Sequence, residues 1–168
     1  MKRIILTLVL AIATVAAASA QNYMVVNSEK VFKSIEAYNN ALESIDALAA
    51  EYQQQVDARF ADVEQLYNNY MQVRATLSDT ARQEREATIL DAEANATKYQ
   101  ESLFGTDGEL MKKRMELIQP IQSKVFTAIE NFSKQYGFDL VIDIAANPTV
   151  LCYSEKVNYT ERVIEVLK

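Results

Sequence analysis

The chain has 168 residues, of which 49% are hydrophobic and 24% are charged, and its formal net charge is −6. This acidic balance argues against nucleic acid as the main partner. The chain has no histidine and one cysteine, and its sequence shows neither a metal-ligand cluster nor a glycine-rich phosphate loop, so we expect no enzyme activity and no bound cofactor or metal.

Residues 1–20 have the features of a cleaved export signal. Two basic residues follow the initiating Met, an apolar run extends over residues 4–18, and Ala18-Ser19-Ala20 is a small-residue cleavage site. The run is short for a membrane span, which needs roughly 20 apolar residues. We therefore expect a mature chain that begins at Gln21, has a net charge of −8 after the two basic residues are lost, and has no stable membrane insertion.

Two long apolar seams predict an antiparallel helical hairpin, or arm, over residues 36–136. In each seam, apolar residues recur at steps of three or four, with alanine, glutamine and charged residues on the other faces, which is typical of a coiled coil. The pattern stops at Ser78-Asp79-Thr80, so we expect the tip near residues 78–80, where Thr80 and Gln83 would form a capping box. The first seam consists of Tyr38, Leu42, Ile45, Ala49, Tyr52, Val56, Phe60, Val63, Tyr67 and Tyr70, and the second of Ile89, Ala92, Ala96, Tyr99, Leu103, Leu110, Leu117, Ile121, Val125, Ile129 and Phe132.

Three residues interrupt the second seam. Gly105 and Gly108 each cost about 1 kcal/mol relative to alanine inside a helix, and Pro120 removes a helical hydrogen bond. They are candidate hinges that would let the arm flex. The alternative is that they are local irregularities that fit the two helices together.

Short apolar segments at both ends of the mature chain predict a small β body, formed by residues 21–35 and 137–168. An isolated two-stranded ribbon is marginal in water, so we expect this body to be completed by strands from other copies of the chain. The fold class is therefore α+β, with a helical hairpin and a short C-terminal helix. The expected strands are residues 23–27, 138–144 and 150–154.

Four residues in these ends have specific expected roles. Ser28 would cap the helix that follows the first strand, and Thr160 would cap the final helix. Gly137 would end the long helix before the second strand. Cys152 is expected to be a small buried apolar residue, with an intermolecular disulfide as the alternative.

The order of signal, strand, long hairpin, paired strands and terminal helix resembles the Skp (OmpH) family of periplasmic chaperones. Residues 24–32 resemble the opening of that family, residues 136–143 its aspartate-flanked strand, and residues 150–154 with 159–163 its final strand and helix. The resemblance covers the whole mature chain. It is sharp at the ends and only periodic in the arm.

This resemblance implies a homotrimer in the periplasm of a Gram-negative cell. The end strands of three subunits would form a small β-barrel, and three hairpins would surround a cavity. Unfolded outer-membrane β-barrel proteins would be held there without ATP and kept from aggregating. The residues implied in the trimer body are Val25, Val26, Leu140, Val141, Ile142, Leu151 and Tyr153.

The arm departs from the best-known members of that family in its charge. Their arms are basic, whereas residues 36–136 of this chain carry 17 acidic and 10 basic side chains. These charges do not favour long-range capture of acidic clients, so client contacts would depend on adaptable apolar side chains. The candidates are Met71, Phe104, Met111 and Met115, for which the alternative is an ordinary place in the hairpin seam.

Other functions fit the same pattern. One is a structural coiled-coil spacer or tether of the cell envelope, in which the end strands serve only to trimerise. Another is a subunit that binds one folded envelope partner. Separately, Asp79-Thr80-Ala81 fits a short acceptor pattern used by some Gram-negative envelope O-glycosylation systems, although a capping role for Thr80 would also explain its presence.

Overall fold

The structure, a computed structural model, describes residues 22–168. The expected export signal and its cleavage site lie outside the described residues. The chain forms two compact units. From here on, the arm means Glu36–Ile121, and the body means residues 22–35 with Gln122–Lys168, in place of the expected ranges. The second boundary lies inside a helix rather than at residue 137 as expected, because Val125 and Phe132 belong to the core of the body.

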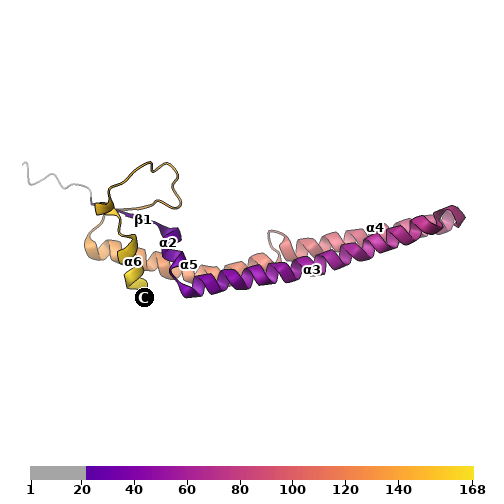
Figure 1. Cartoon of the computed structure of the whole chain (residues 1–168), viewed down its shortest axis with the longest axis horizontal. Helices are drawn as coiled ribbons and strands as arrows, with labels where there is room; N and C mark the ends of the chain where they lie inside the picture. Colours follow the sequence, from indigo (N-terminus) through magenta and orange to yellow (C-terminus); the bar gives the residue numbers. More distant parts are fainter. Residues whose placement is uncertain (1–21) are drawn as a thin grey trace, which may run out of the picture. The chain divides into compact units, whose positions relative to one another are not determined.

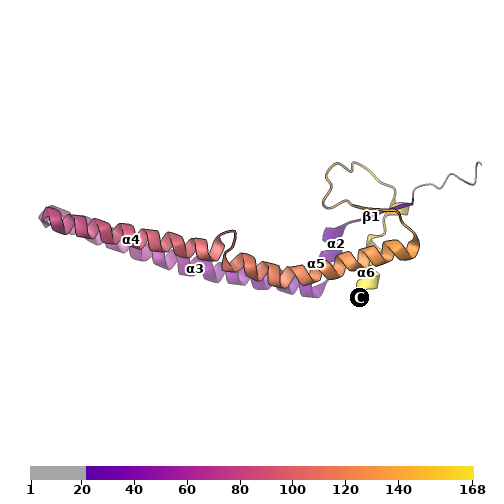
Figure 2. The same cartoon turned by 180° about the vertical axis from the view of Figure 1, so that it is seen from behind.

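The arm contains a helical hairpin. Helix α3 (Glu36–Val73) ends in a short 3₁₀ turn, η1 (Arg74–Thr76), after which α4 (Asp79–Phe104) runs back along α3 in both views (Figure 1 and Figure 2). The arm also includes the first part of α5 (Glu109–Tyr136). The direction of α4 is antiparallel to that of α3, because Tyr70 near the end of α3 contacts Glu86 near the start of α4.

The predicted seams are the faces on which the arm helices pack. Seam residues from both helices are buried, whereas Tyr67 differs because it is 49% exposed. A second cluster joins the start of α3 to α5, with Ala41, Ile45 and Ile118 at its centre. The buried seam residues of the arm are Ile45, Val56, Tyr70, Ala96 and Leu103.

Ser78, rather than Thr80, caps α4. The Ser78 backbone is extended, and its hydroxyl accepts a hydrogen bond from the Ala81 backbone N–H at 3.3 Å. Thr80 lies inside the first helical turn, so the capping box predicted from Thr80 and Gln83 is wrong. The helix begins earlier than expected because Ser78 is the residue whose side chain can reach a free N–H of the first turn.

A loop over residues 105–108 separates α4 from α5. Gly105 ends α4, and its backbone N–H donates to the Glu101 carbonyl at 2.8 Å. A Cβ added at Gly108 would lie 2.6 Å from the Leu103 carbonyl oxygen, so the tight loop requires glycine there. Pro120 lies inside α5, which continues through it. The hinge role of these residues remains a prediction.

The body is organised around two strands. β1 (Tyr23–Val26) pairs in parallel with β2 (Leu140–Asp143). Three of the four residues of β1 are buried, which is typical of a strand covered on both faces. The covering helices are α2 (Ser28–Lys33), the C-terminal part of α5, and α6 (Thr160–Leu167), which follows a short 3₁₀ turn, η2 (Glu155–Val157). The buried core cluster consists of Met24, Val26, Val31, Val125, Phe132, Val163 and Ile164.

Polar contacts join three segments beside the sheet. The side chain of Asn27 caps α2 by accepting from the Lys30 N–H at 2.9 Å, so the expected cap Ser28 is wrong. Ser28 instead donates its hydroxyl to Asp143 at 2.6 Å. Thr160 does not cap α6 either, because its Oγ1 accepts from the Asn27 N–H at 2.9 Å. The hydroxyls expected to cap helices therefore link the two ends of the chain.

Gly137 ends α5, as expected. Its φ of +69° is in the left-handed region. The Phe138 N–H donates to the Ser133 carbonyl at 2.9 Å, and the Gly137 N–H donates to the Lys134 carbonyl at 3.3 Å. These two bonds form a Schellman motif, which favours glycine because other residues are strained at positive φ.

Residues 150–154 do not form the expected third strand. In the described chain, β1 and β2 form a two-stranded sheet, and each is shorter than the expected 23–27 and 138–144. Leu151 is 93% exposed, and Cys152 is exposed rather than buried as expected. A segment becomes a strand only when a neighbouring strand shares its hydrogen bonds, and residues 22–168 of one chain do not provide that neighbour.

The two hydroxyls at the arm turn should differ in their effect on stability. Ser78→Ala removes the cap of α4 and should lower the free energy of unfolding by about 1 kcal/mol. Thr80→Ala removes a hydroxyl that makes no hydrogen bond in the described chain, so its effect should stay within about 0.5 kcal/mol. Thermal unfolding followed by circular dichroism compares the two variants. Equal destabilisation by both would contradict the assignment of the cap.

Candidate functional site

Exposed apolar side chains gather on the arm near the hairpin turn. Tyr67, Met71 and Val73 lie in the last part of α3, and all three are exposed. Leu90 on α4 is 63% exposed. Single exposed apolar residues are normal on a protein surface, whereas a group of them marks an interaction surface. This group is therefore the candidate site on the arm.

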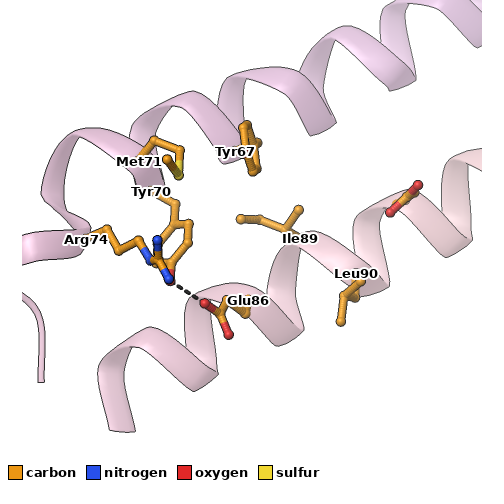
Figure 3. A pocket seen from close by; sticks show the side chains of 8 residues that line it. Tyr67, Tyr70, Met71, Arg74, Glu86, Ile89 and Leu90 are labelled. Atoms are coloured by element: carbon orange, nitrogen blue, oxygen red, sulfur yellow. Dashed lines mark hydrogen bonds between the residues drawn. The ribbon is translucent and has the colours of Figure 1, made fainter. Parts of the chain in front are cut away.

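Three of these residues border a hollow of about 500 Å³ between α3 and α4. Figure 3 shows that Tyr67 and Met71 extend from one helix, and that Ile89 and Leu90 lie on the facing one. The wall is therefore mainly apolar, with charged groups from η1 (Arg74) and α4 (Glu86 and Glu93) around it. The lining residues are Tyr67, Tyr70, Met71, Arg74, Glu86, Ile89, Leu90 and Glu93.

A buried tyrosine forms the polar end of the hollow. Tyr70 is 5% exposed, and its hydroxyl donates a hydrogen bond to the Glu86 carboxylate (Figure 3). This hydrogen bond raises the pKa of Tyr70, because the ionised phenolate would lose it and would face a negative charge. Burial raises the pKa further, and Arg74 acts in the opposite direction. The neutral phenol therefore joins α3 to α4 at this end.

Further contacts hold the arm helices in register beyond the hollow. Tyr99 donates its hydroxyl to the Gln55 side chain, and the Arg59 guanidinium lies 3.7 Å from the centre of the Tyr99 ring. The Tyr52 and Phe104 rings meet edge to face, with their centres 6.3 Å apart. A cation above a ring and perpendicular aromatic pairs are both favourable geometries. These contacts explain why many aromatic residues of the arm are not free to bind a partner.

The structure places the four predicted client-contact residues in different settings. Met71 is exposed and lines the hollow. Phe104 is half-buried against Tyr52. Met111 and Met115 are exposed on α5 but do not line the hollow. The hollow therefore brings Met71 together with residues that were predicted only for the seams, and with Leu90, which was not predicted.

The predicted trimer-body residues fall into three groups. Val25 and Val26 are buried within the core of one body. Val141 and Ile142 are half-buried in β2. Leu140, Leu151 and Tyr153 are exposed. The exposed group is the part of this prediction that is available for contact with another chain.

In the part of the chain that the structure describes, no helix combines the length and the apolar character that a membrane crossing requires. Residues 22–168 also contain no group of three or more His, Cys, Asp or Glu side chains that could hold a metal ion.

Comparison with known proteins places this architecture in a family. The family description "Outer membrane protein (OmpH-like)" matches residues 22–167, which is nearly the whole described chain. The chain belongs to the OmpH-like family. The resemblance read from the sequence ends is thereby confirmed.

The OmpH-like fold is also found among solved structures. A crystal structure of a candidate outer membrane chaperone (OmpH-like) from Caulobacter crescentus CB15 matches with a TM-score of 0.65 and 12% sequence identity. The match covers 90% of this chain and 86% of that one. At this identity the likeness concerns the fold. No curated protein sequence matches the chain.

Sequence reasoning missed part of the surface that this OmpH-like chain presents. Leu90 follows the seam residue Ile89 directly, and consecutive residues of a helix do not share one face. That rule could have identified Leu90 as exposed. The exposure of Tyr67 and the hollow itself depend on how far the two helices separate, and apolar spacing carries no information about that separation.

The link between Tyr70 and Glu86 predicts a pH dependence in this OmpH-like chain. Because the pKa of Tyr70 is raised in the folded state, the link contributes fully below the ordinary tyrosine pKa of about 10 and is lost as pH rises through the raised value. Glu86→Gln should move the pKa of Tyr70 down toward its ordinary value. An NMR titration of ring-labelled tyrosines measures this pKa, and Tyr70→Phe identifies the signal. An unchanged titration in Glu86→Gln would contradict the role of Glu86.

Proposed function

We propose that this protein is an ATP-independent chaperone of the Gram-negative periplasm, which binds unfolded outer-membrane β-barrel proteins and prevents their aggregation. Membership in the OmpH-like family supports the chaperone role and the periplasmic location. The observation that carries the proposal is the exposed apolar surface of the arm, where Tyr67, Met71 and Leu90 surround an open hollow.

The chemistry of this surface suits clients of varied sequence. An unfolded barrel strand has apolar side chains at alternate positions and aggregates in water. Methionine adapts its shape to different partners, and tyrosine combines an apolar ring with a polar end. Each contact is weak, so many contacts can hold a client while each one exchanges quickly. Such binding is reversible without ATP, so the client can leave the chaperone when it inserts into the outer membrane.

The charge of the arm has a separate effect. Its acidic excess does not draw in acidic clients, and ordinary salt screens surface charges beyond about 10 Å. Like charge on the arms of separate molecules instead opposes their association. The apolar surface can therefore remain exposed without the chaperone aggregating on its own.

The edge of the small sheet supports assembly of the body into a homotrimer. Within residues 22–168, β2 pairs with β1 and has no strand on its other edge. Leu140, Leu151 and Tyr153 are exposed in and after β2. Open sheet edges are normally covered or closed, and strands from two further copies would close this one. A hollow of about 150 Å³ in the body, lined in part by Phe126 and Val141, offers space for a neighbour's apolar side chain.

A light-scattering assay tests the chaperone proposal. A denatured outer-membrane barrel protein is diluted into buffer with and without the mature chain, which should suppress scattering at near-equal molar amounts. The triple variant Tyr67→Ser, Met71→Ser, Leu90→Ser should bind the client on the order of a hundredfold more weakly and should therefore need a large molar excess for the same effect. Each lost apolar contact weakens binding by on the order of 1 kcal/mol, and about 1.4 kcal/mol corresponds to tenfold in affinity.

The matched control is Val166→Ser in α6, because Val166 is 60% exposed but belongs to the body. It should suppress scattering as well as the unaltered chain does. If the unaltered chain leaves aggregation unchanged, the chaperone proposal fails and a spacer or tether is favoured. If the triple variant is fully active, the hollow is not the client surface.

Sedimentation tests the proposed assembly. The mature chain should sediment with three times the mass of one chain. Leu151→Asp places a charge on a side chain that the assembly would bury, and should shift the protein toward monomer. Val166→Asp, at an exposed position of the body, should not. A single, well-folded monomer at all concentrations would overturn the proposed trimer.

A further inference from the structure

The turn of the arm carries a motif that the proposed chaperone function does not use. Asp79-Thr80-Ala81 matches an O-glycosylation acceptor pattern, and elsewhere in the chain no aspartate is followed by serine or threonine. Capping of α4 offered a purely structural reason for a threonine at this position. The structure removes that reason, because Ser78 provides the cap.

The hydroxyl of Thr80 is available for reaction. Thr80 is exposed, and its hydroxyl has no hydrogen-bond partner in the described chain. The nearest threonines along the sequence differ in this respect. Thr76 donates to the Val73 carbonyl and Thr88 donates to the Glu84 carbonyl, each at 2.8 Å. A transferase would therefore not have to break a hydrogen bond to reach the Thr80 oxygen.

The residues around Thr80 are also accessible. The Asp79 side chain is 91% exposed, although one of its oxygens accepts from Arg82 at 2.8 Å. A surface ion pair of this kind contributes little to stability, so it would yield readily to a recognising enzyme. Leu77 and Ser78 already have extended backbone angles. Thr80 lies in the first turn, where backbone N–H groups have no helical acceptor, so presenting the motif in extended form requires only that this turn unwind.

From these features we propose that Thr80 is an O-glycosylation site. The donor would be a sugar linked through phosphate to a lipid carrier, with an envelope transferase as the catalyst. Thr80 Oγ1 attacks the anomeric carbon, and the bond between that carbon and the phosphate oxygen breaks. The hydroxyl proton passes to a base of the transferase, and the lipid phosphate leaves with the electron pair. The product is a glycosidic bond, with no change in oxidation state.

A glycan at this position would change the surface of the arm at its turn. Sugars are strongly hydrated, and Val73 and Met71 lie exposed just before the same turn. The glycan would therefore oppose association between the turns of separate molecules. This inference does not depend on the chaperone proposal, because it concerns a covalent product that is detected directly.

Mass spectrometry of the full chain, purified from the envelope of the cell that produces it, tests the site. Trypsin should release residues 75–82 as one peptide, because Arg74 and Arg82 flank it. We expect this peptide to carry the mass of one or more sugars. Electron-transfer fragmentation should place the added mass on Thr80 rather than on Thr76 or Ser78. Recovery of this peptide only in unmodified form would overturn the proposal.

Variants made in the same cell separate recognition from folding. Thr80→Ala and Asp79→Asn should each abolish the added mass, whereas Thr76→Ala should retain it. Circular dichroism should show that all three are folded. Retention of the sugar in Thr80→Ala, or its location on Thr76 or Ser78, would contradict the assignment. Retention in Asp79→Asn would show that the Asp-Thr-Ala motif is not what is recognised.

Discussion

The parallel pairing of β1 with β2 is the constraint on which the rest of the chain depends. It joins two segments that are more than a hundred residues apart, with Tyr23 opposite Leu140. Parallel strands cannot be joined by a tight turn and need a long crossover, and here the whole arm lies within that crossover. The entropic penalty for closing a loop rises only slowly with its length. Contacts of Asp143 with Ser28 and of Thr160 with Asn27 reinforce the pairing.

The arm separates two uses of apolar surface. Most large side chains of its seams are consumed in packing α3 against α4 and α5, and several tyrosines are further held by hydrogen bonds or by a cation above the ring. What remains exposed is a small set near the turn, together with Met111 and Met115 on α5, on helices with a net negative charge. A chaperone needs this combination, because its surface must attract unfolded chains without attracting other copies of itself. Packing supplies the stability, and the residual exposure is the surface that the proposed client binding would use.

Elements with a fixed apolar period were predicted well from the sequence. Helix caps, for which adjacent residues compete, and strands, which need a neighbouring strand, were not. The seams follow a helical repeat, and Gly137 ends α5 because the positive φ there suits glycine. The caps were misplaced because two or three possible capping residues are adjacent, as in Asn27-Ser28, and the backbone decides which of them reaches a free N–H. Residues 150–154 have the composition of a strand, but pairing depends on a neighbour. The hollow depends on the separation of two helices, to which no sequence period is sensitive.

The loop between α4 and α5 has a mechanical consequence for the arm. In a continuous helix, residues 105–108 would add roughly 6 Å of length and slightly more than one turn. Leu103 before the loop is buried, and Leu110 after it packs against the cluster around Ala41, Ile45 and Ile118, so the packed face continues on both sides of the loop. The arm thus accommodates the four extra residues of this loop between α4 and α5, while α3 stays unbroken. Length differences between its two sides are taken up at one joint, and the interlocking of side chains on either side of that joint is preserved.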